Sequence, residues 1–289
     1  MRLARSSLPP GCRSRPRISV FKGCSGEIFI EDSGVKRVLK WTLGGLLLIS
    51  LVGGGLWLWR ADLLAEFHGL KPKKEKPVPD LERYEVLESE LSRWREDLVL
   101  QYRKARSPEQ KAAVEHDARV ILEMVLPEMM RCWLGTGYDF NGIAERPGKG
   151  KIACGYYVST LIRDAGFKVN RYKLAQQPSA NILHTFTNEE NCQLRVGEKY
   201  DTYADWLEGM EPGIYLMGLD THVGFVVVER SGDMKFIHSS GMNKAGVVEE
   251  TRDQAASIKW SNWRMLGRFT ADPKVIRTWL AGEDVRVVE

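Results

Sequence analysis

Lys151-Ile-Ala-Cys-Gly-Tyr-Tyr-Val-Ser-Thr-Leu-Ile-Arg-Asp-Ala-Gly-Phe167 is the stretch that decides the fold, because it predicts a helix with a cysteine in its first turn. Apolar side chains at Val158, Leu161 and Ile162 recur at helical spacing, and Cys154 lies four residues before Val158 on the same face. The glycine and phenylalanine at the end are typical of a left-handed helix terminus. The thiol is therefore predicted to point into the domain, where the first backbone N–H groups of the helix are free.

A thiol at the start of a helix is a candidate nucleophile. The free N–H groups and the positive end of the helix dipole stabilise a thiolate and lower the pKa of the thiol. An isolated cysteine in such a pattern is more often an inert buried side chain. The residues downstream of Cys154 must therefore decide between these two interpretations.

Two predicted strands downstream each carry a histidine. His222 opens a β-branched run that ends at Val228, and His238 ends a run that begins at Met234. Facing residues of an antiparallel pair have a constant sum of residue numbers, so an even sum places both histidines on one face and close together. An even sum requires a connection of three or five residues, or a bulge. Gly224 has no side chain and would leave room for a substrate or for the cysteine helix.

These side chains suit nucleophilic catalysis, with His222 as general base and His238 as the group that orients it. The alternatives are two strand-end histidines with satisfied hydrogen bonds, or a zinc site made of both histidines and Cys154. Neither an HExxH motif nor paired CxxC motifs are present, and there is no GxSxG serine motif. The glycine-rich segment 135–142 matches no phosphate-binding pattern. We expect no metal and no cofactor.

Two helices are predicted before this region. Apolar residues from Leu81 to Tyr102 recur every three or four positions, which indicates a helix with one apolar face. Ser107-Pro-Glu-Gln110 supplies an N-cap, a proline at the first helical position and a capping-box glutamine for a second helix, expected to end or kink at Pro127. We expect residues 81–134 to form an antiparallel hairpin with a packing role, and residues 135–289 to form the catalytic domain.

The uncharged run WTLGGLLLISLVGGGLWLW, residues 41–59, is long enough to cross a bilayer and has tryptophans at both ends. A buried helix or a signal peptide is the alternative. Basic residues before the run predict a single-pass protein of the inner membrane, with a cytoplasmic tail at 1–40, a linker at 60–80 and a periplasmic or extracellular domain. A second interpretation of the tail places the true start of translation at Val35.

The charge distribution argues against a nucleic-acid partner. Residues 1–40 contain nine Lys or Arg and three Asp or Glu, so the formal net charge of +4 leaves −2 for the rest of the chain. The predicted globular part is therefore not basic, as a nucleic-acid-binding domain would be.

Five cysteines are too few for a dense disulfide framework. Cys12 and Cys24 fall in the predicted tail, which leaves Cys132, Cys154 and Cys192 in the exported part. The sequence leaves open whether Cys132 and Cys192 form a disulfide or stay separate buried thiols.

Five segments between Gly135 and Ser240 occur in a characteristic order: Tyr138-Asp-Phe-Asn-Gly142, Ala153 to Gly166, Glu211-Pro-Gly-Ile-Tyr-Leu216, His222-Val-Gly-Phe-Val-Val227 and Phe236-Ile-His238. This order resembles the NlpC-type cysteine peptidases, the papain-like hydrolases of bacterial cell walls. The resemblance implies an α+β domain with a small antiparallel sheet packed on the cysteine helix. It also implies Cys154 as nucleophile, His222 as base and His238 as orienting residue.

The chain departs from the family at both neighbours of the nucleophile. The family usually reads Asp-Cys-Ser-Gly, whereas Ala153 and Gly155 flank the cysteine here. In members that bind the free amine of a stem peptide, these flanks help to hold it, so that specificity does not carry over. Tyr138 matches a tyrosine of the family's upstream segment, and we expect it to contact substrate together with Gly155 and Gly224.

The expected reaction is hydrolysis of an amide through a thioester on Cys154, with His222 moving the proton from the thiol to the leaving amine. The backbone N–H of Cys154 is the expected donor to the oxyanion. The outward topology favours peptidoglycan, or another peptide of the cell envelope, as substrate. The alternatives are an acyltransferase that uses the same residues and a membrane-tethered binding module without activity.

Overall fold

A computed structural model describes residues 76–242 and 246–289. The predicted tail at 1–40, the predicted span at 41–59 and most of the predicted linker at 60–80 lie outside the described residues. Within the described ranges, no helix combines the length and apolar character that a bilayer crossing requires. These residues all belong to one compact unit, so the predicted hairpin and the predicted catalytic domain share it.

The predicted hairpin is confirmed as α2 (Leu81–Lys104) and α3 (Pro108–Arg131). The Ser107 hydroxyl accepts the backbone N–H of Gln110, and the Gln110 side chain accepts the N–H of Ser107, which completes the predicted capping box. Of the two alternatives predicted at Pro127, a helix end or a kink, the end is wrong, because α3 continues to Arg131. Buried apolar side chains around the proline hold this last turn in the core, namely Leu126, Met129 and Met130.

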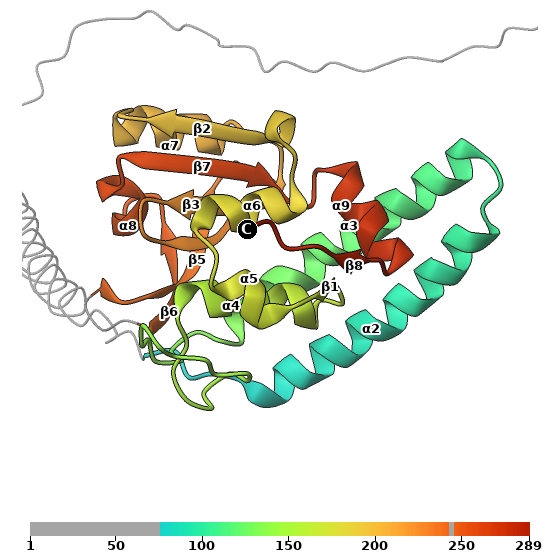
Figure 1. The fold of residues 1–289 in the computed structure, drawn as a ribbon, viewed down its shortest axis with the longest axis horizontal. Coiled ribbons are helices and arrows are strands. Elements are labelled where there is room, and N and C mark those ends of the chain that lie inside the picture. Colours follow the sequence, from blue (N-terminus) through green and yellow to red (C-terminus); the bar gives the residue numbers. More distant parts are fainter. Residues whose placement is uncertain (1–75, 243–245) are drawn as a thin grey trace, which may run out of the picture. The chain divides into compact units, whose positions relative to one another are not determined.

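Six strands form one antiparallel sheet in the order β2-β7-β3-β4-β5-β6, which confirms the α+β class (Figure 1). Their bounds are β2 (Cys192–Val196), β3 (Gly213–Leu219), β4 (Val223–Val228), β5 (Met234–Ser240), β6 (Gly246–Thr251) and β7 (Trp263–Arg268). Two short strands, β1 (Lys168–Val169) and β8 (Asp284–Val285), pair in parallel apart from it.

The strands that bear the two histidines pair with an even sum of residue numbers, which is the condition under which both histidines share a face. Phe225 faces Ile237 and Val228 faces Met234, across a five-residue connection at 229–233. Continuing this register by one position places Gly224 opposite His238. Both histidines are therefore on the same face of the sheet.

The two faces of the sheet carry separate apolar clusters. α4 (Cys154–Asp164) packs against β4 and β5 in the larger cluster, with Tyr157, Phe225 and Ile237 in its interior. Alternate residues of the same strands, such as Val226 and Phe236, belong to the smaller cluster on the other face. The remaining helices are α5 (Arg171–Ala175), α6 (Ser179–Phe186), α7 (Tyr200–Glu208), α8 (Ala256–Trp260) and α9 (Pro273–Ala281), with a 3₁₀ turn at Glu189–Asn191.

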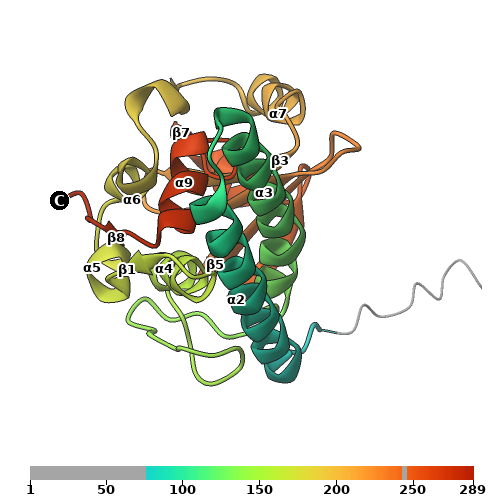
Figure 2. The same cartoon turned by 90° about the vertical axis from the view of Figure 1, so that its right-hand side faces the viewer.

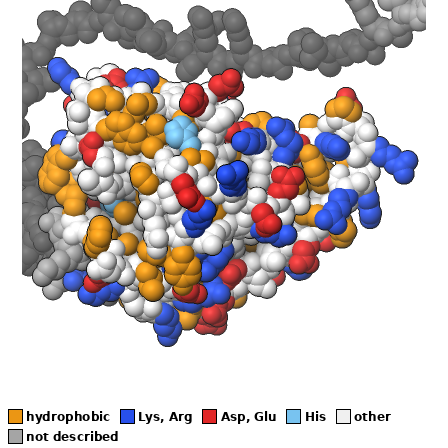
Figure 3. All heavy atoms as spheres, in the orientation of Figure 1, with side chains coloured by type: hydrophobic (Ala, Val, Ile, Leu, Met, Phe, Trp, Pro, Cys, Tyr) orange, Lys and Arg blue, Asp and Glu red, His pale blue; other side chains and the backbone are white. Residues whose placement is uncertain are grey.

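The hairpin packs against the rest of the unit through α9. Figure 2 shows α9 beside both α2 and α3, and all three helices contact one another. Its outer surface carries mixed charges. On the face drawn in Figure 3, Lys and Arg side chains are interspersed with Asp and Glu. Arg83 of α2 forms an ion pair with Glu128 of α3.

Candidate active site

Cys154 is the first residue of α4, as predicted, and this helix has an open N-terminus. Ala153 occupies the cap position with φ −80° and ψ 160°, and no side chain caps the helix. The Ala153 N–H donates to the carbonyl of Gly142, at 2.9 Å, which anchors the chain as it enters the helix. The N–H groups of the first helical turn therefore remain available to a ligand or to the thiol itself.

Burial raises the pKa of the Cys154 thiol above its ordinary value. The backbone N–H groups of Val223, Gly155 and Cys154 itself act in the opposite direction and lower the pKa. The prediction that the helix start lowers the pKa of this thiol is therefore wrong in its net direction, because loss of water from the buried sulfur outweighs the effect of the N–H groups. At rest the group is a neutral thiol that needs a base to take its proton.

The two predicted histidines are in direct contact. His222 Nε2 and His238 Nδ1 are 2.6 Å apart, and the two rings are nearly perpendicular, with an interplanar angle of 83°. His238 is fully buried and stacks on Phe236 with ring centroids 4.1 Å apart. The ring of His238 is therefore fixed by packing on one side and by hydrogen bonding at its edge.

A third side chain extends this pair. His238 Nε2 lies 3.0 Å from Oε2 of Glu250, a residue of β6 that the sequence analysis did not single out. The available signal was the strand pattern of residues 246–251 after His238, in which Glu250 shares a face with Val248. The register confirms this placement, since Val248 faces His238 and Glu250 faces Phe236.

Burial changes the pKa of all three groups in favour of their neutral forms. Burial lowers the pKa of His222 to about 3, with a smaller contribution from the neighbouring His238, whose own pKa burial also lowers to about 3. Burial raises the pKa of Glu250 to about 7. Both rings are therefore neutral at neutral pH, so each has one N–H and one lone pair.

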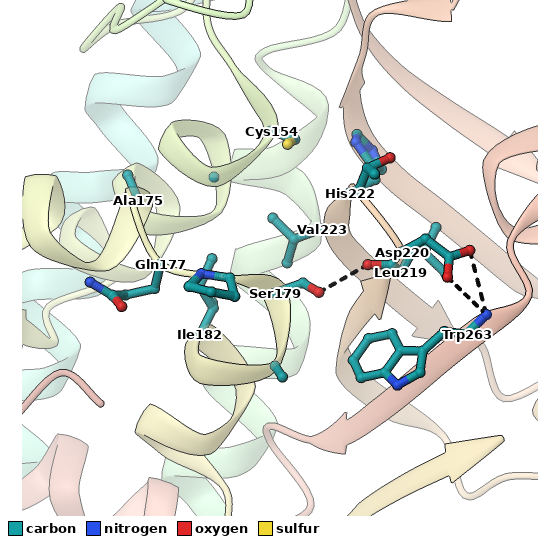
Figure 4. A pocket seen from close by; sticks show the side chains of 14 residues that line it. Cys154, Ala175, Gln177, Ser179, Ile182, Leu219, Asp220, His222, Val223 and Trp263 are labelled. Carbon is teal, nitrogen blue, oxygen red and sulfur yellow. Dashed lines mark hydrogen bonds between the residues drawn. The ribbon is translucent and has the colours of Figure 1, made fainter. Parts of the chain in front are cut away.

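A cavity of about 470 Å³ opens beside the thiol. Cys154 at the start of α4 and His222 at the start of β4 lie on facing sides of this cavity (Figure 4). Its floor is largely apolar, and the lining side chains include Pro178, Ala180, Ile182, Leu219 and Trp263. A hydrophobic group attached to a reacting carbonyl fits this environment.

A second cavity, of about 360 Å³, lies on the other side of the turn between β3 and β4. Both cavities are lined by the turn from Leu219 to His222. Hydroxyl groups are prominent in the second cavity, which is lined by Tyr138, Ser240, Ser257 and Ser261 together with Trp260 and other residues. The candidate base thus lies where an apolar cavity and a more polar cavity meet.

Asp220 holds this turn in place. Its carboxylate accepts the Ser261 hydroxyl at 2.6 Å and the backbone N–H of Asn262 at 2.8 Å, and Ser261 in particular lowers the pKa of the carboxyl. On the other side, the Ser179 hydroxyl donates to the carbonyl of Leu219 at 3.0 Å (Figure 4). These bonds tie the position of His222 to both α6 and the start of β7.

The three residues predicted to contact substrate have different surroundings. Tyr138 lines the second cavity, and burial raises the pKa of its phenol. Gly155 lines the first cavity, and a Cβ there would be 2.3 Å from the carbonyl oxygen of Ala175, so the glycine permits close packing of α5. Gly224 lines neither cavity. A Cβ at this position would be 2.7 Å from His238 Cβ, so the space expected for a substrate or for α4 is filled by the His238 and Phe236 side chains.

The three described cysteines are free thiols, so the disulfide that the sequence left open between Cys132 and Cys192 is not formed. Burial raises the pKa of Cys132 to about 11, and the sulfur of Cys192 lies 2.8 Å from the hydroxyl of Thr187. In the part of the chain that the structure describes, no group of three or more His, Cys, Asp or Glu side chains is arranged to hold a metal ion.

In comparisons with known proteins, no family model, no curated protein and no solved structure matches this chain. The α+β class therefore rests on the structure alone, and the geometry of the site is the basis for any proposed reaction.

Proposed function

We propose that this protein is a cysteine hydrolase that cleaves an amide bond, and a divergent member of the NlpC-type peptidases. One observation carries the proposal: the Cys154 thiol, at an uncapped helix start, shares a cavity with His222, whose ring is hydrogen-bonded to the buried His238. A nucleophile, a base and a group that orients the base form the constellation of covalent hydrolases.

Acylation starts when the lone pair on the free ring nitrogen of His222 takes the Cys154 proton. The thiolate sulfur attacks the substrate carbonyl, and the electrons of the C=O bond move to the oxygen, which the Cys154 N–H stabilises. The oxyanion then collapses, the C–N bond breaks, and the leaving nitrogen takes the proton from His222. The products of this half-reaction are a free amine and a thioester on Cys154.

Deacylation reverses these roles with water. His222 takes a proton from water, the hydroxide oxygen attacks the thioester, and the C–S bond breaks to release a carboxylic acid. The proton returns from His222 to the sulfur. Burial, which lowers the pKa of His222 to about 3, keeps the ring neutral before the reaction, so the imidazolium must be stabilised by the negative sulfur or oxygen beside it.

The proposed substrate is a peptide of the cell wall, with the stem peptides of peptidoglycan as the first candidate. The two cavities on either side of the Leu219–His222 turn offer room for both halves of an extended substrate. The predicted span at residues 41–59 would hold the domain in the cell envelope, at the outer side of the inner membrane.

The test compares the full-length chain, the Cys154→Ser variant and a Cys192→Ser control, each incubated with purified peptidoglycan. We expect new amine and carboxyl ends, read by mass spectrometry, with the wild type and the control but not with Cys154→Ser. Equal products from all three proteins would refute the mechanism. If an added amine captures the acyl group in preference to water, the same site belongs to an acyltransferase.

A further inference from the structure

The ring of His238 connects the carboxylate of Glu250 to His222, the base of the proposed hydrolase. His222, His238 and Glu250 come from the starts or interiors of three successive strands, and the contacts between them are 2.6 Å and 3.0 Å. Both nitrogens of the fully buried His238 are used in these two contacts. Stacking on Phe236 restricts the ring of His238 and keeps it from turning toward other hydrogen-bond partners.

We infer that Glu250 is a positioning residue, which selects the tautomer of His222 through His238 and thereby decides whether His222 can act as a base. The inference rests on the proposed function for the identity of the base. The geometry of the three side chains and the donor and acceptor capacity of each group carry the argument.

An ionised carboxylate can only accept hydrogen bonds. Ionised Glu250 therefore requires the proton of His238 on Nε2, which leaves the lone pair of that ring on Nδ1. His222 must then donate from Nε2 to His238, and its own lone pair is on Nδ1. This free lone pair is the one that can take the proton of the Cys154 thiol.

A protonated Glu250 has an O–H that can donate, and when it donates to His238 the direction of every bond in the chain is reversed. Its O–H donates to Nε2 of His238, so the proton of that ring moves to Nδ1 and is donated to Nε2 of His222. His222 then carries its proton on Nδ1 and has no lone pair for the thiol. The Glu250 side chain is 21% exposed and can take a proton from solvent. That single proton leaves His222, two rings away, unable to act as a base.

The surroundings place this switch near neutral pH. Burial is the cause that raises the pKa of the Glu250 carboxyl to about 7. The charged residues next to Glu250 in the sequence are bound elsewhere, since Glu249 of β6 pairs with Arg131, and Arg252, just after β6, pairs with acidic residues of α7. The titratable groups on the elements packed around the chain of rings are His238 of β5, His222 before β4, Cys154 of α4 and Tyr138 of the preceding loop.

The decisive measurement is on the wild-type full-length chain, with ¹⁵N-labelled histidine and NMR. We expect the protonated and the bare ring nitrogens of both His222 and His238 to exchange identities as the pH passes through about 7. Tautomers that stay constant between pH 5 and pH 9 would overturn the inference. This measurement needs no variant, so it does not depend on whether a substituted protein folds.

A second experiment follows the rate at which iodoacetamide alkylates Cys154, as a function of pH, in the wild type, Glu250→Gln and Glu250→Asp. The wild type should show a rise in rate near pH 7 and a second rise where the thiol ionises by itself. Glu250→Gln cannot ionise, so the first rise should be absent whichever end of the amide faces His238. Glu250→Asp should restore the first rise, at a shifted pH.

Glu249→Gln is the matched control, because this neighbouring carboxylate faces the other side of β6 and binds Arg131. It should leave the first rise in place, and loss of that rise in the control would contradict the role of Glu250. Alkylation and NMR use no substrate. A protein that fails to cleave peptidoglycan but shows the tautomer exchange would refute the proposed hydrolysis alone, and active protein with constant tautomers would refute this inference alone.

Discussion

The starts of α3 and α4 solve the same physical problem in opposite ways. At α3, Ser107 and Gln110 satisfy each other's backbone N–H groups in a complete capping box. At α4, Ala153 has a backbone conformation that a capping residue could use, but it has no side-chain acceptor. The N–H groups of Cys154 and Gly155 instead lower the pKa of the Cys154 thiol, against the larger effect of burial.

In the proposed hydrolase, this difference separates a helix start that contributes to stability from one that contributes to catalysis. A cap contributes about 1 kcal/mol of stability, and α4 forgoes it. In return, its donors are free to stabilise a thiolate, or the oxyanion of a reacting carbonyl. Ala153 has no side-chain acceptor that would compete for these donors.

Removing the sulfur tests this comparison most severely. A serine at position 154 keeps the helix start but offers a hydroxyl that does not ionise near neutral pH, so we expect peptide cleavage to fall at least about 10³-fold. The thermal midpoint of unfolding should change little. Turnover is measured by release of new amine ends, and Cys192→Ser, another partly buried thiol, should retain full activity.

The next largest effect is expected at Gly155. The uncapped start is held by close packing, because the Ala175 carbonyl oxygen would be 2.3 Å from a Cβ at this position. We expect Gly155→Ala to lower the free energy of unfolding by about 1–3 kcal/mol, measured in urea.

Gly209 provides the control for Gly155. It ends α7 with φ −82°, and a Cβ there would make ordinary contacts at 3.5 Å. Gly209→Ala should therefore be neutral or slightly stabilising. Similar losses for both variants would show that the close approach at Gly155 is unimportant.

Capping α4 should trade reactivity for stability. In Ala153→Ser, the new hydroxyl can accept a first-turn N–H, so we expect a gain of about 1 kcal/mol in unfolding free energy. The thiolate loses part of its stabilisation, which raises the pKa of Cys154 and moves the alkylation profile to higher pH. At a fixed pH near 7.5, alkylation should be about fivefold slower. A variant that alkylates faster than the wild type would contradict this trade.

Removing the cap of α3 is the complementary experiment, with the smallest effect on function. Ser107→Ala should lower the free energy of unfolding by about 1 kcal/mol and leave the alkylation rate of Cys154 unchanged. A change in alkylation rate would show that the two helix starts are coupled, and the comparison between them would then fail.

Elements with strong local signals could be predicted from the sequence. The capping box and the apolar stripe of the hairpin, the Cys154 helix and the strands that bear His222 and His238 all depend on neighbours within a few residues. The common face of the two histidines was also predictable, because it follows from the length of the turn between the strands.

Elements that depend on distant partners could not be predicted. β2 is a polar edge strand that pairs with β7, about seventy residues later, and neither was assigned from the sequence. Pro127 argued for a helix end, but the packing of the last turn of α3 overrides that local preference.

The candidate site shows the same division. The position of Cys154 at a helix start was visible, whereas the burial that raises the pKa of its thiol is a property of the whole fold. Glu250 was missed because its contact with His238 depends on the pairing of β5 with β6.

One contact of the hairpin has a consequence for ancestry. The indole N–H of Trp279, on α9, donates to the carbonyl of Ala165 at the end of the cysteine helix, and the guanidinium of Arg95, on α2, donates to the carbonyl of Trp279. The first hairpin helix is thus bonded, through a single residue, to the far end of the helix that carries the nucleophile. A shuffled gene segment that began at Gly135 would lose these contacts, so we expect the hairpin and the cysteine helix to be inherited together.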